Sequence, residues 1–191
     1  MTPPAASRPG GRSRRVQCAV HDAVKSLLET VGRDDLSIPA IAERASVTPS
    51  TIYRRWGSLP ELLADVAVAR FRQEEPPADR GSLRADLEAW AVQYAEEMAS
   101  GPGRAMIHDV LGSKDGTSAI RCCGITLDQL GAMVERAEAR GEQSPPPQAL
   151  LDRIVAPIVY RILFDTAPEQ ETCLALVNDA LRPRTASKIE P

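Results

Sequence analysis

The chain has little of the residues that build metal sites, disulfides and enzyme active sites. Its 191 residues include seven aromatic side chains, two histidines and four cysteines. No two cysteines are spaced as a CxxC pair, so there is no zinc-binding pattern, and a disulfide framework is not expected either. The sequence also has no glycine-rich phosphate loop and no nucleophile motif. These shortages argue against an enzyme, and we expect no cofactor and no bound metal.

Long apolar runs are missing as well. No stretch approaches the roughly 20 consecutive apolar residues that a membrane-spanning helix needs. The chain opens with MTPPAASRPGGRSRR, which lacks the apolar core of a signal peptide. We therefore expect a cytoplasmic protein with no membrane partner.

Two short helical patterns separated by a tight turn stand out in residues 38–63, which read IPAIAERASVTPSTIYRRWGSLPELL. Ser37 can cap the first helix, and Pro39 lies in its first turn, where a missing N–H costs nothing. Thr48 can cap the second helix, with Pro49 at its first position. The sequence thus predicts where both helices begin.

The spacing inside these two patterns is that of a helix-turn-helix. Ala42, Ser46 and Ile52 fall where this motif needs a small residue, a turn residue and an apolar anchor, and Trp56 should also point inward. A hydroxyl, aromatic and guanidinium surface remains on the outside of the second helix and suits phosphates and base edges. It consists of Ser50, Thr51, Tyr53, Arg54 and Arg55.

The distribution of charge supports DNA binding. The net charge of −3 alone would argue against a nucleic-acid partner. Residues 1–57, however, hold nine Lys and Arg against five Asp and Glu, whereas residues 58–191 hold fourteen against twenty-one. A basic first part joined to an acidic second part is typical of a DNA-binding domain attached to something else.

No segment alternates apolar and polar residues as a strand does, and apolar residues recur at helical spacing instead. This predicts an all-α fold of about nine helices, with an N-terminal three-helix DNA-binding domain and a C-terminal helical domain for ligand binding and dimerisation. Pro157 should kink the helix that contains it. The expected domains are a disordered basic tail (1–14), the DNA-binding domain (15–75), the effector-binding and dimerisation domain (76–183) and a second tail (184–191). The expected helices cover about 15–31, 38–45, 49–56, 59–73, 82–99, a short segment after 102, 118–140, 148–166 and 168–181.

Residues 16–71 resemble the N-terminal domain of the tetracycline-repressor (TetR) family of bacterial transcriptional regulators. The strings IAERASVTPSTIYRRW and SLPELL match the family pattern I-A-x-x-A-G-V-S-x-x-T-[LI]-Y-x-[HY]-[FW]-x-[SN]-K-x-x-L. Two positions depart from it. Ser46 replaces the usual Gly, so we expect mild strain in the turn. Leu59 replaces a Lys that grips phosphate in the family, so one phosphate contact should be missing.

The resemblance implies which residues face DNA: Ser37, Thr48, Pro49, Ser50, Thr51, Tyr53, Arg54 and Arg55. Thr51 and Tyr53 would contact phosphates, and Arg54 or Arg55 would read guanine or clamp a phosphate. Tyr53 could instead pack against the first helix, and either arginine could be a solvated charge. Arg8, Arg12, Arg14 and Arg15 are expected to form a mobile arm, which either enters a minor groove or is a solvated tail.

The second half of the chain is similar to a common regulatory-domain type, in which the last two helices pair with their dimer mates and earlier helices enclose a ligand. The candidate dimer interface comprises Leu151, Ile154, Ile158, Ile162, Val177 and Leu181. Large or polarizable side chains are the candidates for an effector pocket, although a residue of this kind, taken singly, more often belongs to an ordinary core. They are Trp90, Tyr94, Met98, Met106, His108, Met133, Tyr160 and Phe164.

The sequence therefore predicts a dimeric regulator that binds a palindromic double-stranded operator, most simply a repressor that a small hydrophobic or aromatic molecule releases. An effector-independent DNA-binding protein is the alternative. An enzyme with a DNA-binding tether is a third reading, which the absence of catalytic motifs disfavours.

Overall fold

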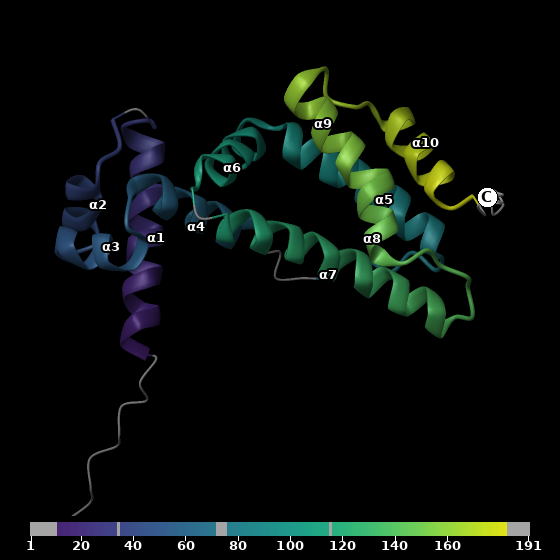
Figure 1. The fold of residues 1–191 in the computed structure, drawn as a ribbon, viewed down its shortest axis with the longest axis horizontal. Helices are drawn as coiled ribbons and strands as arrows, with labels where there is room; N and C mark the ends of the chain where they lie inside the picture. The colour runs from purple at the N-terminus through teal and green to yellow at the C-terminus, as the bar shows by residue number, and fades with distance from the viewer. Residues whose placement is uncertain (1–10, 34, 72–75, 115, 183–191) are drawn as a thin grey trace, which may run out of the picture.

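Every regular element in the part of the chain that the computed structural model describes, residues 11–33, 35–71, 76–114 and 116–182, is a helix (Figure 1). The segments α8, η1 and α9 follow one another without a break, so the described residues form nine helices, which confirms the predicted all-α fold. None of these helices is long and apolar enough to cross a membrane. The elements are α1 (Gly11–Thr30), α2 (Ile38–Arg44), α3 (Pro49–Trp56), α4 (Leu59–Phe71), α5 (Leu83–Ala99), α6 (Gly101–Gly112), α7 (Thr117–Ala139), α8 (Pro147–Leu150), η1 (Leu151–Val155), α9 (Ala156–Phe164) and α10 (Gln170–Ala180).

The first helix starts earlier than predicted. It begins at Gly11, so Arg12, Arg14 and Arg15 belong to α1, and the prediction that they form a mobile arm is wrong. The reason is that no helix breaker follows Gly11 until Gly32, and adding a turn to an existing helix needs no new nucleus. Arg8 and the tail predicted over 184–191 lie outside the described residues.

Helices α1 to α3 and the first half of α4 form a small helical unit, here called the head. Its core buries Ala42, Ile52 and Trp56, as the helix-turn-helix pattern predicts. The hydroxyl of Ser37 accepts the Ala40 N–H at 3.4 Å, which confirms its predicted role as the cap of α2. Thr48 occupies the cap position of α3 but makes no hydrogen bond to the backbone there.

The turn of the helix-turn-helix carries the expected strain. Ser46 has a φ of 53°, the left-handed region, and it is the one non-glycine residue with positive φ among those described. A side chain in this region costs about 1 kcal/mol or more. Glycine would adopt the same backbone without that cost.

Helices α5 to α10 form the larger unit, here called the body, around a second core. Helix α4 belongs to both cores. Leu62, Leu63 and Val66 pack in the head core, whereas the next two residues, Ala67 and Val68, pack in the body core. Figure 1 shows α4 leaving the head toward the body, where it packs against α6 and α7. The head is therefore joined to the body by a shared helix.

Pro157 distorts its helix as predicted, but the distortion takes the form of a π-helical turn, η1, placed before the proline. In that turn the N–H of Ala156 bonds to the carbonyl of Leu151, five residues back. The wider turn accommodates a residue that has no N–H of its own.

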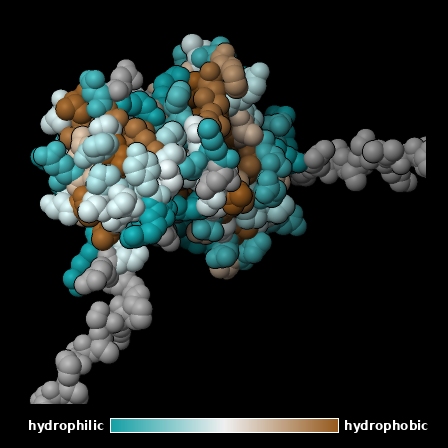
Figure 2. Space-filling view, turned by 60° about the vertical axis from the view of Figure 1, so that its left-hand side comes forward, coloured by the Kyte–Doolittle hydropathy of each residue, from teal (hydrophilic) through white to brown (hydrophobic). Residues whose placement is uncertain are grey.

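In the view that turns the head toward the reader, the surface is largely hydrophilic with separate hydrophobic areas (Figure 2).

Candidate DNA interface and head–body junction

The outward side of α3 carries a continuous polar surface. Ile52 and Trp56 are buried, which leaves Ser50, Tyr53 and Arg54 exposed on the other side. The Thr48 hydroxyl lies 2.9 Å from that of Ser50 and 3.0 Å from that of Thr51, so the three hydroxyls form one hydrogen-bonded group at the start of the helix. Hydroxyls at a helix N-terminus, where backbone N–H groups also point outward, suit a phosphate.

Tyr53 is 53% exposed, so its phenol is available to a partner. Pro49 and Ser37 are exposed as well, each at the beginning of its helix.

The two arginines of α3 differ. Arg55 donates to the carbonyl and hydroxyl of Ser13 at 3.0 and 2.8 Å and to the side-chain oxygen of Gln17 at 2.7 Å, and its guanidinium lies over the ring of Trp56. These contacts tie α3 to the first turns of α1. Arg54 has no hydrogen-bonded or ionic partner among the described residues. Arg54 is therefore the cation of α3 that is free to meet DNA.

The start of α4 departs from the family in the way that the sequence indicated. Leu59 is half-buried against the head core, where a lysine would extend into solvent. The Ser58 hydroxyl accepts the Glu61 N–H at 3.4 Å, which is half of the capping box that Ser58 and Glu61 could form. The Glu61 carboxylate instead accepts the Ser113 hydroxyl at 2.6 Å and the Lys114 N–H at 2.7 Å from the loop after α6.

A single carboxylate on α4, that of Asp65, binds three other helices. One of its oxygens accepts from Gln17 at 3.0 Å and from the Trp56 indole at 2.9 Å and lies 2.9 Å from the ring nitrogen Nε2 of His21. The other oxygen accepts from Arg121 of α7 at 2.5 Å. Burial works against the charge of Asp65, but the hydrogen bonds from His21, Arg121 and Trp56 outweigh it and hold the pKa of this carboxyl well below its usual range.

A second ion pair crosses from head to body. Arg33, in the loop after α1, pairs with the buried Asp109 of α6, with Nη1 3.0 Å from Oδ2. Neither this pair nor the Asp65 contacts were foreseen from the sequence. A carboxylate within the apolar run LLADVAV was the available signal, because a charge on a buried face requires partners.

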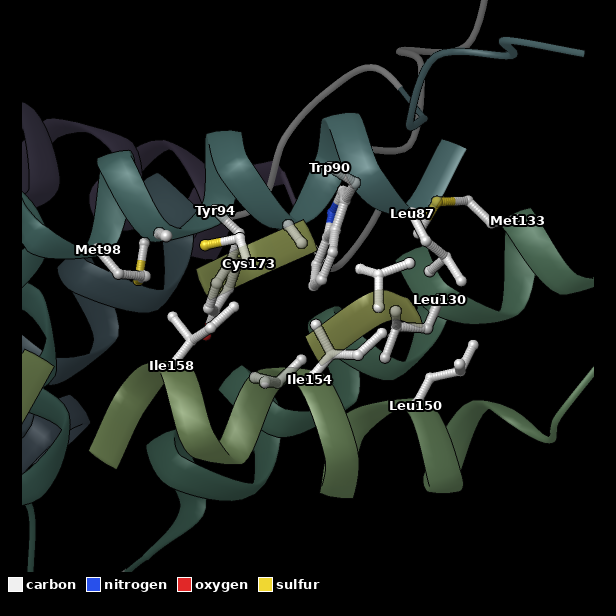
Figure 3. Close-up of a cluster of buried hydrophobic side chains, with 14 of the residues drawn as sticks. Leu87, Trp90, Tyr94, Met98, Leu130, Met133, Leu150, Ile154, Ile158 and Cys173 are labelled. Atoms are coloured by element: carbon white, nitrogen blue, oxygen red, sulfur yellow. The ribbon is translucent and has the colours of Figure 1, made fainter. Parts of the chain in front are cut away.

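The candidates for the effector pocket divide into a buried group and an exposed group. Trp90, Tyr94, Met98, Met106 and Met133 are buried in the body core. Figure 3 shows Trp90, Tyr94 and Met98 of α5 facing residues of α7, η1 and α9, among them Leu130, Ile154 and Ile158. The rings of Trp90 and Tyr94 stack with centroids 4.9 Å apart, and the Trp90 indole donates to Gln129 at 3.0 Å. Burial raises the pKa of Tyr94 above its usual value. Trp90, Tyr94 and Met133 are packed as core residues, whereas Met98 and Met106 also line hollows beside α6.

The other three pocket candidates lie on the surface. His108 is exposed, and the buried group beside it is Asp109. Tyr160 and Phe164 are 66% and 73% exposed on the outer side of α9, with ring centroids 5.0 Å apart. They cannot line an internal pocket of the body.

Most of the predicted dimer interface is buried inside the chain itself. Ile154, Ile158, Ile162 and Val177 have at most 1% exposure and belong to the body core, so the prediction that they meet a second chain is wrong. The physical reason is that these residues cover α5 and α7 of their own chain. Leu151 and Leu181 are half-buried at the edge of that core and remain available in part.

Comparisons with known proteins agree with this architecture. A family model described as "Bacterial regulatory proteins, tetR family" matches residues 21–66. A second model, described as "Tetracyclin repressor-like, C-terminal domain", matches residues 77–181, which is more than half of the chain. The first match ends within α4 and the second begins before α5, with residues 67–76 between them.

Two curated relatives are similar over much of the chain. The chain is 30% identical over 135 residues to the HTH-type transcriptional regulator AqdR of Rhodococcus erythropolis. That match covers 69% of this chain and 65% of AqdR, so the chain spans just under two thirds of that relative's length. It is also 30% identical over 166 residues to the uncharacterized HTH-type transcriptional regulator Mb1581 of Mycobacterium bovis, with 82% of this chain and 81% of the relative covered.

Solved structures share the fold. The TetR family transcription regulator SCO0332 superposes with a TM-score of 0.67 at 24% identity, covering 88% of this chain and all of that one. Thermus thermophilus FadR, a TetR family repressor solved with lauroyl-CoA, superposes with a TM-score of 0.60 at 17% identity, covering 92% of this chain and all of FadR. At these identities the likeness establishes the arrangement of helices.

Proposed function

Because the chain belongs to the TetR family of bacterial regulatory proteins, we propose that it is a dimeric repressor that a small molecule releases from a palindromic operator. As a member of this family it is a helix-turn-helix transcriptional regulator. Dimerisation, repression and the response to a small molecule are what the proposal adds. The observation that carries it is the polar surface of α3, in which Arg54 is unpaired among the described residues and stands beside a group of three hydroxyls.

The operator contacts can be tested after footprinting on the DNA that flanks the gene. Arg54→Gln should weaken operator binding by about 1–3 kcal/mol if Arg54 reads a base, or lower the salt slope by about one if it clamps a phosphate. Arg55→Gln should loosen the packing of α3 on α1 and lower thermal stability, because the guanidinium of Arg55 binds Ser13 and Gln17.

Arg80→Gln provides the control for these variants, because it removes the same charge at an exposed position outside the head, in the segment before α5. Unchanged operator binding in Arg54→Gln, at every salt concentration, would contradict the proposal that α3 contacts the operator through Arg54.

We place the dimer contact on the outer side of α9. Tyr160, Leu163 and Phe164 are exposed there, and a cluster of large apolar groups on the surface of a soluble protein commonly marks an interface. Binding to a palindromic operator requires a two-fold axis that sets the two α3 helices about one DNA turn, ~34–36 Å, apart or somewhat more. The half-buried Leu151 and Leu181 could extend the contact.

Phe164→Glu combined with Tyr160→Glu should yield folded monomers with weak operator affinity, as sedimentation and circular dichroism would show. Arg161→Glu is the matched control on an exposed neighbouring position. A wild-type protein that sediments as a monomer at micromolar concentration would end the dimer proposal.

The packed surroundings of Trp90 and Tyr94 favour a second possibility, an effector-independent DNA-binding protein. Footprinting distinguishes the two. A repressor should protect one palindromic site, whereas a structural DNA-binding protein should protect DNA without sequence preference.

A further inference from the structure

A groove lies between head and body, here called the junction groove. It has a volume of about 700 Å³ and lies between α1, α4 and α6. This is within the roughly 300–1,000 Å³ that small-molecule sites occupy. One wall is apolar, and its main contributors are Val24, Leu28, Leu63, Val66 and Met106.

The charges around the junction groove favour an anion. Lys25, Arg33 and Arg70 line it against Glu29 and Asp109. Arg33 and Asp109 neutralise one another in an ion pair, which leaves two cations against one carboxylate. The lining therefore has an excess of about one positive charge.

Arg70 is the best placed of these cations. Its side chain is exposed and has no ionic or hydrogen-bonded partner among the described residues. It also lines an adjoining hollow of about 280 Å³, together with Glu97, Met98 and Met106, so it lies where the two hollows meet. Lys25, by contrast, has Asp22 3.9 Å away on the same helix.

We propose that the junction groove binds a small amphipathic monocarboxylate, with its carboxylate on Arg70 and its apolar part along Leu63, Val66 and Met106. An apolar wall removes the hydrocarbon from water, and a guanidinium without a partner gains a charge-assisted, bidentate hydrogen bond. A neutral hydrocarbon would leave Arg70 unpaired, and a cation would be repelled.

A ligand in this position contacts α1 and α4 of the head and α6 of the body at the same time. Its affinity then depends on how the head lies against the body, so binding must bias that arrangement. Only this consequence for DNA rests on the proposed function. The binding site itself does not depend on operator recognition.

The test measures binding by calorimetry on the whole protein without DNA. Decanoate is the probe, with decanol as its neutral analogue and decyltrimethylammonium as its cationic one, all below the concentrations at which they form micelles. Decanoate should bind at least about tenfold more tightly than decanol, and the cation should not bind. Arg70→Gln should lower decanoate affinity about tenfold and leave decanol unchanged, whereas Arg80→Gln should change neither.

A second pair of variants locates the site. Ala105 is exposed on α6 and lines the groove, so Ala105→Trp should fill it and abolish decanoate binding. Ala139→Trp, at the exposed end of α7, should bind decanoate like the wild type.

Three results would overturn the proposal: no decanoate binding, equal binding of decanoate and decanol, or binding that Ala105→Trp does not affect. A gel-shift experiment on the operator separates this proposal from the proposed function. Groove binding that leaves operator affinity unchanged supports the site and refutes its regulatory role. Groove binding by a protein that ignores DNA supports the site and refutes the proposed function.

Discussion

Replacing Asp65 with asparagine should be among the most damaging single changes that preserve side-chain size. The carboxylate holds α1, α3, α4 and α7 together through hydrogen bonds to both of its oxygens. An asparagine has one acceptor oxygen and one NH₂ group. Whichever way it turns, the NH₂ faces a donor, either Arg121 or the group formed by Gln17, His21 and Trp56.

The magnitude follows from these contacts. The better orientation keeps the oxygen toward His21 and Trp56 and gives up Arg121. Because Arg121 is 46% exposed, its bond is worth only about 0.5–1 kcal/mol. The hydrogen bonds from His21 and Trp56 would each be made to a neutral acceptor in place of a charged one, which weakens each bond by about 1 kcal/mol. Asp65→Asn should therefore lower the free energy of unfolding by about 3 kcal/mol.

Urea unfolding followed by circular dichroism, at fixed protein concentration, measures this difference, and its pH dependence identifies the charge as the cause. The pKa of Asp65 is lowered by folding, so its stabilisation is complete above the unfolded value of about 3.9 and is lost as the pH falls below that value. Between pH 6 and pH 3 the gap between wild type and Asp65→Asn should shrink by about 1 kcal/mol, since each unit below the unfolded pKa removes about 1.4 kcal/mol.

Asp128→Asn is the control, because Asp128 is an exposed carboxylate on α7. It should change stability by less than about 0.5 kcal/mol. The reasoning fails if Asp65→Asn is equally mild, or if its effect is the same at pH 3 as at pH 6.

Three further variants test separate features. Ser46→Gly should raise the free energy of unfolding by about 0.5–1 kcal/mol, which would be seen as a higher Tm. Glycine relieves the strain at a φ of 53°, and this gain exceeds the freedom that glycine adds to the unfolded chain. A lower Tm would show that the Ser46 hydroxyl contributes more to stability than the backbone strain costs. Gly103→Ala should lower the free energy of unfolding by roughly 3 kcal/mol in the same thermal assay, because a Cβ there would lie 2.0 Å from the carbonyl oxygen of Glu97. An unchanged Tm would mean that α6 can move away from α5. Leu59→Lys should strengthen operator binding and increase the salt slope by about one in fluorescence anisotropy titrations, because it places a cation at the start of α4. An unchanged slope would indicate that this position does not reach the backbone of the DNA.

The sequence predicted the helices well because their signals are local. Ser37, Pro39 and Pro49 fix where α2 and α3 begin, and apolar spacing fixes which sides of the head helices are buried. The same holds for the polar surface of α3, where burial of Ile52 and Trp56 leaves Tyr53 and Arg54 outside. The start of α1 was missed because nothing local marks it.

The body was predicted less well because α9 is apolar on most of its circumference. Ile158 and Tyr160 are two residues apart and hence lie on nearly opposite sides of a helix that turns about 100° per residue. Either side could cover the core, and the sequence contains no local signal for the choice. The structure buries Ile158 and exposes Tyr160, which reverses the assignments made from the sequence. Ion pairs such as Arg33 with Asp109, 76 residues apart, depend on packing that only the fold supplies.

The shared helix α4 has a consequence for how this regulator could exchange parts with its relatives. Leu62 and Leu63 belong to the head core, and Ala67 and Val68 belong to the body core. A recombination point inside α4 would therefore combine residues of two different proteins within one of these cores. A crossover placed after α4 keeps the helix whole. The body of the relative would then have to pack against an α4 whose surface fits α6 of this chain. Asp65 would also lose Arg121, which belongs to α7. New operator specificity should therefore arise more readily by changing the surface of α3 than by exchanging the head.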